Sequence, residues 1–114
     1  MPYINSQDGR RQLLQIGEPA QSAGELNYQI FYFVKHSQLL FDDSKIKWFV
    51  DQFLGERPNY QRYNDMTGAL VRCYAEIKRR LKIEADILLI ILESYNEQIN
   101  KYEDTKIIQN GDVE

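Results

Sequence analysis

A helical fold is indicated most clearly by residues 63–95, YNDMTGALVRCYAEIKRRLKIEADILLIILESY. Its apolar side chains recur every three or four residues, at Tyr63, Met66, Leu70, Cys73, Ile77 and Leu81. That spacing places them on one face of an α-helix. Neither glycine nor proline occurs between Ala69 and Asn110, so nothing in the composition stops the helix. We therefore expect one long helix over residues 59–100, roughly 60 Å in length at 1.5 Å per residue. That is long for so small a chain, so the helix either breaks or stands out from the body and packs against copies of itself.

The run Ile87–Leu92 within this stretch is apolar at every position. A helix that is apolar on all sides needs cover on all sides, and an exposed run of this kind aggregates. Self-association along the long helix supplies that cover, and a central helix in a monomeric bundle is the alternative. The residues expected at the interface between copies are Met66, Leu70, Ile77, Ile87, Leu88 and Ile91.

The rest of the chain carries start and stop signals for shorter helices. Residues 1–21 are expected to form an extended start and a short helix that ends before Gly17. Residues 22–55 are expected to form two aromatic-rich helices, opened by a capping box at Ser22–Glu25 and by caps at 42–44, with Gly55 ending the second. The segment 31–34 could also form a short strand. The tail, residues 101–114, is polar and ends in a turn or frayed end at 110–112.

These signals predict an all-α fold in a single domain, residues 1–114. We expect a small helical bundle or hairpin with one long C-terminal helix that self-associates. A length of 114 residues, with 43% hydrophobic and 27% charged residues, suits one domain with one core.

Charge and cysteine content exclude several classes of function. The net charge of −3 disfavours binding to polymeric nucleic acid, which usually needs a basic excess. A single cysteine cannot form a disulfide within the chain. The first eleven residues lack a signal-peptide pattern, and the run 87–92 is too short to cross a bilayer. We expect a cytoplasmic protein with no membrane contact.

Catalytic signals are weak throughout the sequence. His36 is the single histidine, so a metal site built from several histidines is excluded. The helix dipole favours a histidine near a helix C-terminus, so the position of His36 needs no functional explanation. Cys73 lies on the apolar face of the expected long helix. This position favours a small buried side chain rather than a nucleophile. Glu93 and Glu97 share helix-turn spacing, but no facing pair precedes them. The sequence therefore predicts a protein that is not an enzyme and uses neither metal nor cofactor.

One basic cluster suggests a ligand instead. Arginine side chains suit phosphate or carboxylate groups, and tyrosine rings stack on planar ligands. A solvated face with internal pairs such as Glu76 with Arg80 is the alternative. The residues expected to hold a small anionic ring compound such as a nucleotide are Tyr60, Tyr63, Arg72, Arg79 and Arg80.

Four stretches taken in order resemble a known family. They are MPYI at 1–4, GELNY at 24–28, NDMTGAL at 64–70 continuing to Cys73 and Arg79–Arg80, and YEDTKI at 102–107 with NGDV at 110–113. In this order the chain resembles a family of short uncharacterised proteins found in phages and in bacterial or environmental sequences. Its members typically begin MPYI, carry a G-D/E-L-N-Y box and a helix ending in an arginine pair, and finish with YEDxKI and NGDV.

The chain departs from that family pattern after Arg80. In the usual pattern a proline and the YED segment follow the arginine pair within a few residues, whereas here residues 81–101 intervene without proline. The family implies no activity and no catalytic residue, but it implies a phage-associated setting.

Three functional classes follow from these observations. The first is a phage-encoded sponge that sequesters a nucleotide immune signal. The second is a structural or adaptor protein that binds a host or viral protein through apolar helices. The third is an enzyme, for which the sequence gives the least support.

Overall fold

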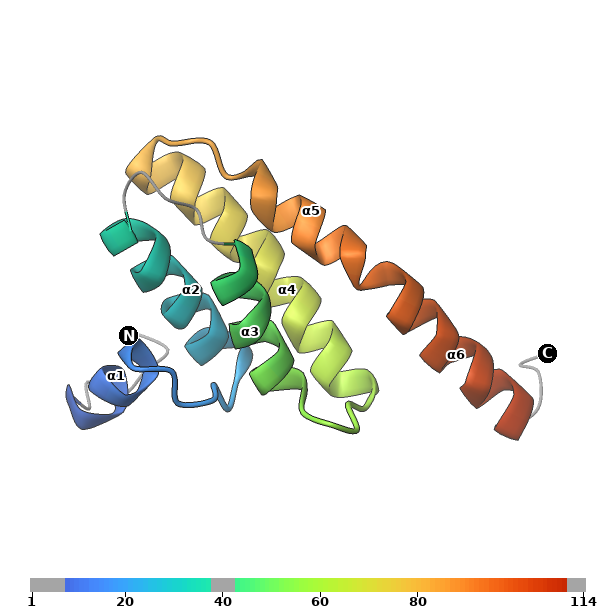
Figure 1. Ribbon diagram of the computed structural model, residues 1–114. Helices are drawn as coiled ribbons and strands as arrows, with labels where there is room; N and C mark the ends of the chain where they lie inside the picture. The colour runs from blue at the N-terminus through green and yellow to red at the C-terminus, as the bar shows by residue number, and fades with distance from the viewer. Residues whose placement is uncertain (1–7, 38–42, 111–114) are drawn as a thin grey trace.

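The protein is a bundle of helices (Figure 1), seen in a computed structural model that describes residues 8–37 and 43–110. The described residues contain helices and loops but no strand, which confirms the all-α prediction and excludes a strand at 31–34. The helices are α1 (Asp8–Gln15), α2 (Ala23–Ser37), α3 (Asp43–Leu54), α4 (Tyr60–Glu76), the π-helical turn η1 (Ile77–Leu81), α5 (Asp86–Ser94) and α6 (Asn96–Asn110). The extended start expected before residue 6, the cap expected at 42 and the turn expected at 111–112 lie outside the described residues.

Glycines end α1 and α3 as expected. Gly17 and Gly55 have φ of +105° and +74°, a left-handed conformation that glycine adopts without strain. The Trp48 ring lies so close to Gly17 that an added Cβ would meet it at 2.9 Å. The side chain of Gln29 fixes the end of α1 to α2, because its Nε2 donates to the carbonyl oxygens of Leu14 and Glu18 at 2.9 and 3.0 Å.

The start of α2 has the predicted cap at its first turn. The Ser22 hydroxyl accepts a hydrogen bond from the backbone N–H of Glu25 at 3.2 Å. The Glu25 carboxylate accepts from the backbone N–H of Gln21 at 2.8 Å and from Arg10 Nε at 2.9 Å. The Arg10 guanidinium is therefore the main reason why the pKa of Glu25 lies below its usual value. This ion pair joins α1 to α2.

The apolar stripe that runs along α4 into η1 forms the centre of the core. Met66, Leu70, Cys73 and Ile77 have no exposed surface. The Asn59 side chain caps α4 by accepting from Arg62 N at 2.8 Å. α2 and α4 run in the same direction, because Asn27 contacts Glu76 and, one turn further along α2, Arg80 lies over the Phe31 ring.

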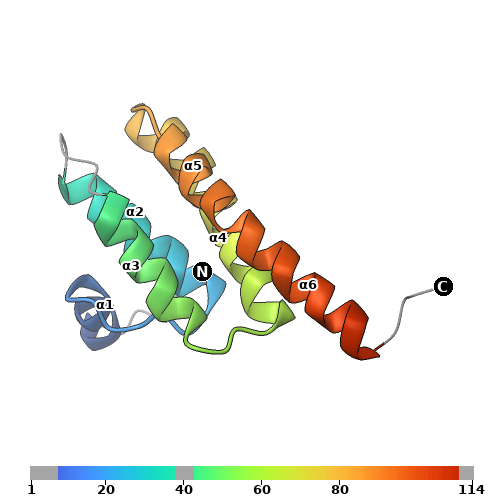
Figure 2. The same ribbon diagram turned by 45° about the vertical axis from the view of Figure 1, so that its right-hand side comes forward.

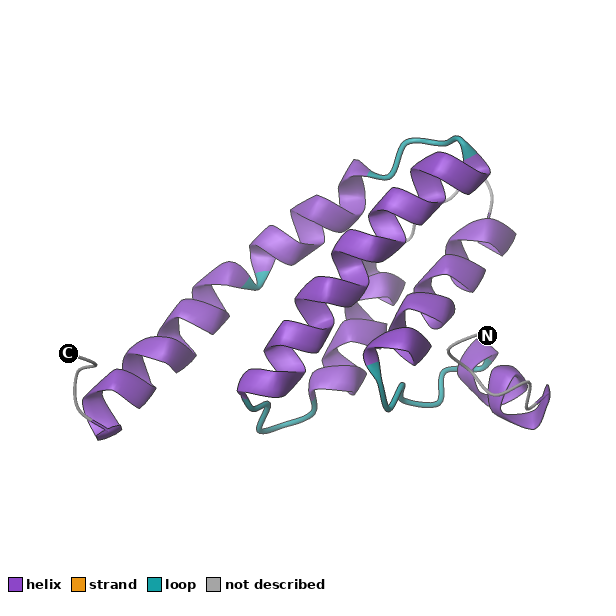
Figure 3. Ribbon diagram, turned by 180° about the vertical axis from the view of Figure 1, so that it is seen from behind, coloured by secondary structure: helices purple, strands orange, loops and turns teal. Residues whose placement is uncertain are grey.

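The long helix expected over 59–100 is broken, and the chain reverses after η1 (Figure 2). Lys82 has φ of +57° and its N–H closes the π-helical turn on the Ile77 carbonyl at 3.1 Å. The Glu84 carboxylate then accepts from the N–H groups of Ala85 and Asp86 at 2.9 and 3.1 Å, which starts α5. α5 folds back to pack on α4, as the view from behind also shows (Figure 3).

This reversal corrects the expected oligomer interface. Leu88 and Ile91 lie in the core with Met66, Leu70 and Ile77, and all five have no exposed surface within a single chain. These side chains are therefore covered by the chain itself and offer no surface to a second copy. Ile87 is half-buried against the same core. The outer side of α5 carries the exposed apolar residues instead, with Leu89 37% and Ile90 62% exposed.

α6 follows α5 after a break at Tyr95 and extends beyond the bundle (Figures 1 and 3). The polar tail expected from residue 101 is helical as far as Asn110. Gln98 Nε2 donates to the Tyr63 hydroxyl at 2.9 Å, and the Tyr102 ring lies 5.3 Å from the Tyr63 ring between centroids. The first half of α6 is therefore joined to the start of α4.

Candidate functional site

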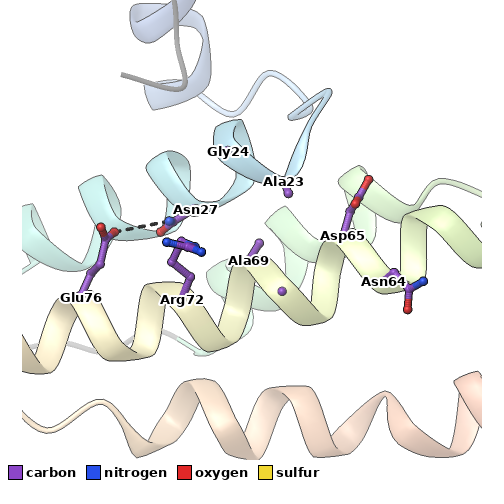
Figure 4. Close-up of a pocket in the computed structure, with 9 residues that line it drawn as sticks. Ala23, Gly24, Asn27, Asn64, Asp65, Ala69, Arg72 and Glu76 are labelled. Carbon is purple, nitrogen blue, oxygen red and sulfur yellow. Dashed lines mark hydrogen bonds between the residues drawn. The ribbon is translucent and has the colours of Figure 1, made fainter. Parts of the chain in front are cut away.

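A groove lies between α2 and α4 (Figure 4). Its volume is about 370 Å³, at the lower end of the range for small-molecule sites. Small residues from both helices keep it open, and an added Cβ at Gly68 would meet nothing within 4 Å. The lining residues are Ala23, Gly24, Asn27, Asn64, Asp65, Gly68, Ala69, Arg72 and Glu76.

Asn27 is a buried polar side chain at one end of the groove. It is 1% exposed, and its Nδ2 donates to Glu76 Oε1 at 3.4 Å. A carboxylate oxygen can only accept in such a bond, so it is the amide nitrogen of Asn27 that faces Glu76. Asn27 Oδ1 has no donor among the described residues. A buried acceptor without a donor is unfavourable, so this atom favours a hydrogen-bond donor nearby.

Arg72 supplies the positive charge of the groove. Its side chain is exposed, and Figure 4 shows the guanidinium beside Asn27. No ion pair or hydrogen bond joins Arg72 to another described residue. Its five N–H donors are therefore available to an anion or another acceptor.

Two carboxylates flank Arg72 along α4. Asp65 accepts from Gln61 Nε2 at 2.8 Å, and Glu76 accepts from Asn27. The charged residues that line the groove are therefore two acids and one base. This charge balance favours a ligand with a single anionic group and further hydrogen-bond donors over a polyanion.

The first turn of α2 borders the groove and adds partial positive charge. The N–H groups of Ala23 and Gly24 have no acceptor among the described residues, since Ser22 Oγ accepts only from Glu25. Neither residue has a side chain large enough to block access to the backbone. The Glu25 carboxylate, which would oppose an anion here, is paired with Arg10.

A family model described as "Domain of unknown function (DUF6899)" matches residues 1–87. The chain belongs to the DUF6899 family. No curated protein and no solved structure matches it. The DUF6899 match covers α1 to α4, η1 and the first two residues of α5, so it includes every residue of the groove. The stretches 24–28 and 64–70, which carry the sequence resemblance, meet across this groove.

The ligand residues expected from the sequence do not gather in one place in this DUF6899 chain. Tyr60, 57% exposed, and Tyr63, which is buried under α6, lie at the start of α4. Arg79 and Arg80 lie in η1, and Arg80 stacks over the Phe31 ring at 4.8 Å from its centroid. Tyr60 and Arg79 are nineteen positions apart, which is about 28 Å along a helix. Of the five expected ligand residues, only Arg72 lines the groove.

Sequence reasoning missed Asn27 and Glu76 as site residues. Asn27 lies on the mainly apolar inner side of α2, where Gln29 is the other buried polar residue. A polar residue at a core position is a usable signal, because buried amides need partners. Its partner Glu76 lies 49 residues away, and no pattern in the sequence joins the two.

Cys73 and His36, which were considered for catalysis, do not line the groove. Cys73 is fully buried, as expected, and its Sγ donates to the Asn27 carbonyl at 3.8 Å. Burial raises the pKa of the Cys73 thiol well above its usual value, which keeps it protonated. His36 stacks on Tyr32 with 4.1 Å between ring centroids. Among the described residues, no group of three or more side chains could hold a metal ion. No described helix is both long and apolar enough to span a membrane.

Proposed function

We propose that this protein is a non-enzymatic binding protein for a small anionic ligand of the nucleotide class. The observation that carries the proposal is the Arg72 guanidinium, which borders the α2–α4 groove and has no acceptor among the described residues. An arginine placed in this way binds phosphate or carboxylate through paired N–H donors. The first turn of α2 supports the same ligand chemistry.

The biological role that we propose is sequestration in the cytoplasm of a bacterial host. The sequence resemblance to phage and bacterial proteins supports a phage-encoded sponge that holds a nucleotide immune signal. A sponge needs no catalytic group, which agrees with the inert setting of Cys73. We also propose that the protein self-associates, with the contact moved from the buried stripe to the outer side of α5 around Ile90.

The exposed apolar residues of α5 also favour a second candidate function. Leu89 and Ile90 would suit the adaptor role, in which a host or viral protein covers this side of the helix. In that case the chain would bind a protein and would show no nucleotide-dependent rise in melting temperature.

Native mass spectrometry of protein purified from cells tests the first proposal. We expect a bound nucleotide-sized anion, identified after denaturation, and a higher melting temperature when the same compound is added to the emptied protein. If no such anion is released, and no linear or cyclic nucleotide raises the melting temperature, the ligand proposal is wrong.

Two matched arginine variants locate the binding site. Arg72→Gln should weaken binding by about tenfold or more, because a charged hydrogen bond is lost. Arg79→Gln should leave binding unchanged, because Arg79 lies in η1 outside the groove. Gly68→Leu should block the groove with little effect on folding, because Gly68 has open space around it. The opposite ranking of the two arginine variants would place the site at η1.

A further inference from the structure

Asn27 and Glu76 together present hydrogen-bond acceptors at one end of the groove. Asn27 Oδ1 is fixed as an acceptor, because the amide nitrogen of the same side chain is held by Glu76 Oε1. The second carboxylate oxygen of Glu76 receives no hydrogen bond from any described residue. Both side chains line the groove and are joined to each other in Figure 4. A ligand that satisfies both acceptors would bring two N–H donors.

From this arrangement we infer that the groove reads the guanine base of its ligand, with Glu76 and Asn27 accepting from the N1–H and 2-amino groups. This inference rests on the proposed nucleotide-binding function. Guanine is the only common base with two adjacent donors on its pairing edge. Adenine offers one donor beside an acceptor nitrogen, which would face a carboxylate oxygen without a proton between them.

Arg72 keeps the role proposed above and binds the anionic group. Its guanidinium lies beside Asn27, and no described residue holds it in place (Figure 4). Asn27 Oδ1 is buried in the free protein, so binding of the base requires Arg72 to turn away toward the phosphate. In this arrangement Arg72 supplies affinity for the anion, and the Asn27–Glu76 pair supplies selectivity among bases.

Three nucleoside monophosphates that differ only in the base edge test this inference. GMP has both donors, IMP lacks the 2-amino group, and AMP replaces the N1–H donor with an acceptor. In titration calorimetry with the full chain we expect IMP to bind about tenfold more weakly than GMP, and AMP about a hundredfold more weakly. Equal affinity for all three would overturn the base-edge inference.

Glu76→Gln supplies the matching protein variant. It should weaken GMP binding by about tenfold and narrow the difference between GMP and AMP, because its amide can donate to adenine N1. Glu93→Gln on the exposed side of α5 is the control and should change nothing. If Glu76→Gln fails to fold by circular dichroism, the ranking of GMP, IMP and AMP on the natural chain decides the inference alone.

Failure of this inference and failure of the proposed function give different results. Equal binding of the three nucleotides that depends on Arg72 overturns the guanine inference and leaves the anion-binding proposal standing. Binding of none of them at millimolar concentration overturns both.

Discussion

The hydroxyl of Tyr95 donates a hydrogen bond to Asp51 Oδ1 at 2.6 Å and so ties the junction of α5 and α6 to α3. The two residues lie 44 positions apart in sequence. Tyr95 is 7% exposed, and burial together with the neighbouring carboxylate raises the pKa of its hydroxyl above the usual value. The bond holds the returning chain against the helices that precede it, which a continuous helix over 59–100 could not do.

Removing this hydroxyl should destabilise the fold without disturbing its packing. Tyr95→Phe keeps the ring in the core but removes the bond to Asp51, so we expect a loss of about 1–2 kcal/mol in the free energy of unfolding. Urea unfolding measures the change. Tyr60→Phe is the matched control, because Tyr60 is 57% exposed, and it should have almost no effect. Equal effects of the two substitutions would contradict the contact between α3 and the α5–α6 junction.

The sign of one glycine substitution distinguishes the reversed chain from a continuous helix. Lys82 has φ of +57°, a conformation that costs most residues about 1–2 kcal/mol and glycine nothing. Because glycine also loses more entropy on folding, we expect Lys82→Gly to stabilise the protein by a net ~0.5 kcal/mol. In a continuous helix the same change would destabilise it by about 1 kcal/mol. Arg79→Gly within η1 is the control and should destabilise. Thermal and urea unfolding of both variants decide between the two structures.

Local chemistry explains which parts of the fold could be predicted. The cap at Ser22 and the stops at Gly17 and Gly55 depend on neighbouring residues only, and all three were predicted correctly. The reversal at Lys82 was not predicted, because nothing in the sequence marks a lysine that adopts the left-handed conformation.

Patterns of burial are less specific than caps and stops. The stripe through Met66, Leu70 and Ile77 predicts burial but not whether a second copy or the same chain provides it. The groove could not be predicted from the sequence, because Asn27 and Glu76 come together only in the folded chain. Arg72 was expected from the sequence because arginine chemistry suggests an anion, and it lines the groove, but its neighbours in space were not those expected.

The ion pair between Arg10 and Glu25 should give the stability a specific dependence on pH. The pKa of Glu25 is lowered in the folded state, so its contribution is present above the unfolded value near 4.5 and is lost as pH falls through the folded value. Arg10 stays charged throughout this range. We expect Glu25→Gln to cost about 1–2 kcal/mol at pH 7 and progressively less below about pH 4.5.

Urea unfolding of the natural chain and Glu25→Gln from pH 7 to pH 3 measures this difference. Comparing the two proteins cancels the titration of other carboxylates. Glu97→Gln is the control, because its pair with Lys101 is almost fully exposed, and its effect should stay small at every pH. A constant difference between the natural chain and Glu25→Gln down to pH 3 would mean that the ion pair does not lower the pKa of Glu25.

Neighbouring isoleucines on α5 separate the core from the proposed contact between copies. Ile91 has no exposed surface and Ile90 is 62% exposed. Ile91→Lys would bury an unpaired charge, so we expect a loss of more than about 3 kcal/mol in stability. Ile90→Lys should leave the free energy of unfolding within about 0.5 kcal/mol. If α5 forms the contact, light scattering should give a multiple of 13.5 kDa for the natural chain and 13.5 kDa for Ile90→Lys. A natural chain of 13.5 kDa at micromolar concentration would rule out self-association, and a stable, folded Ile91→Lys would contradict the placement of α5 in the core.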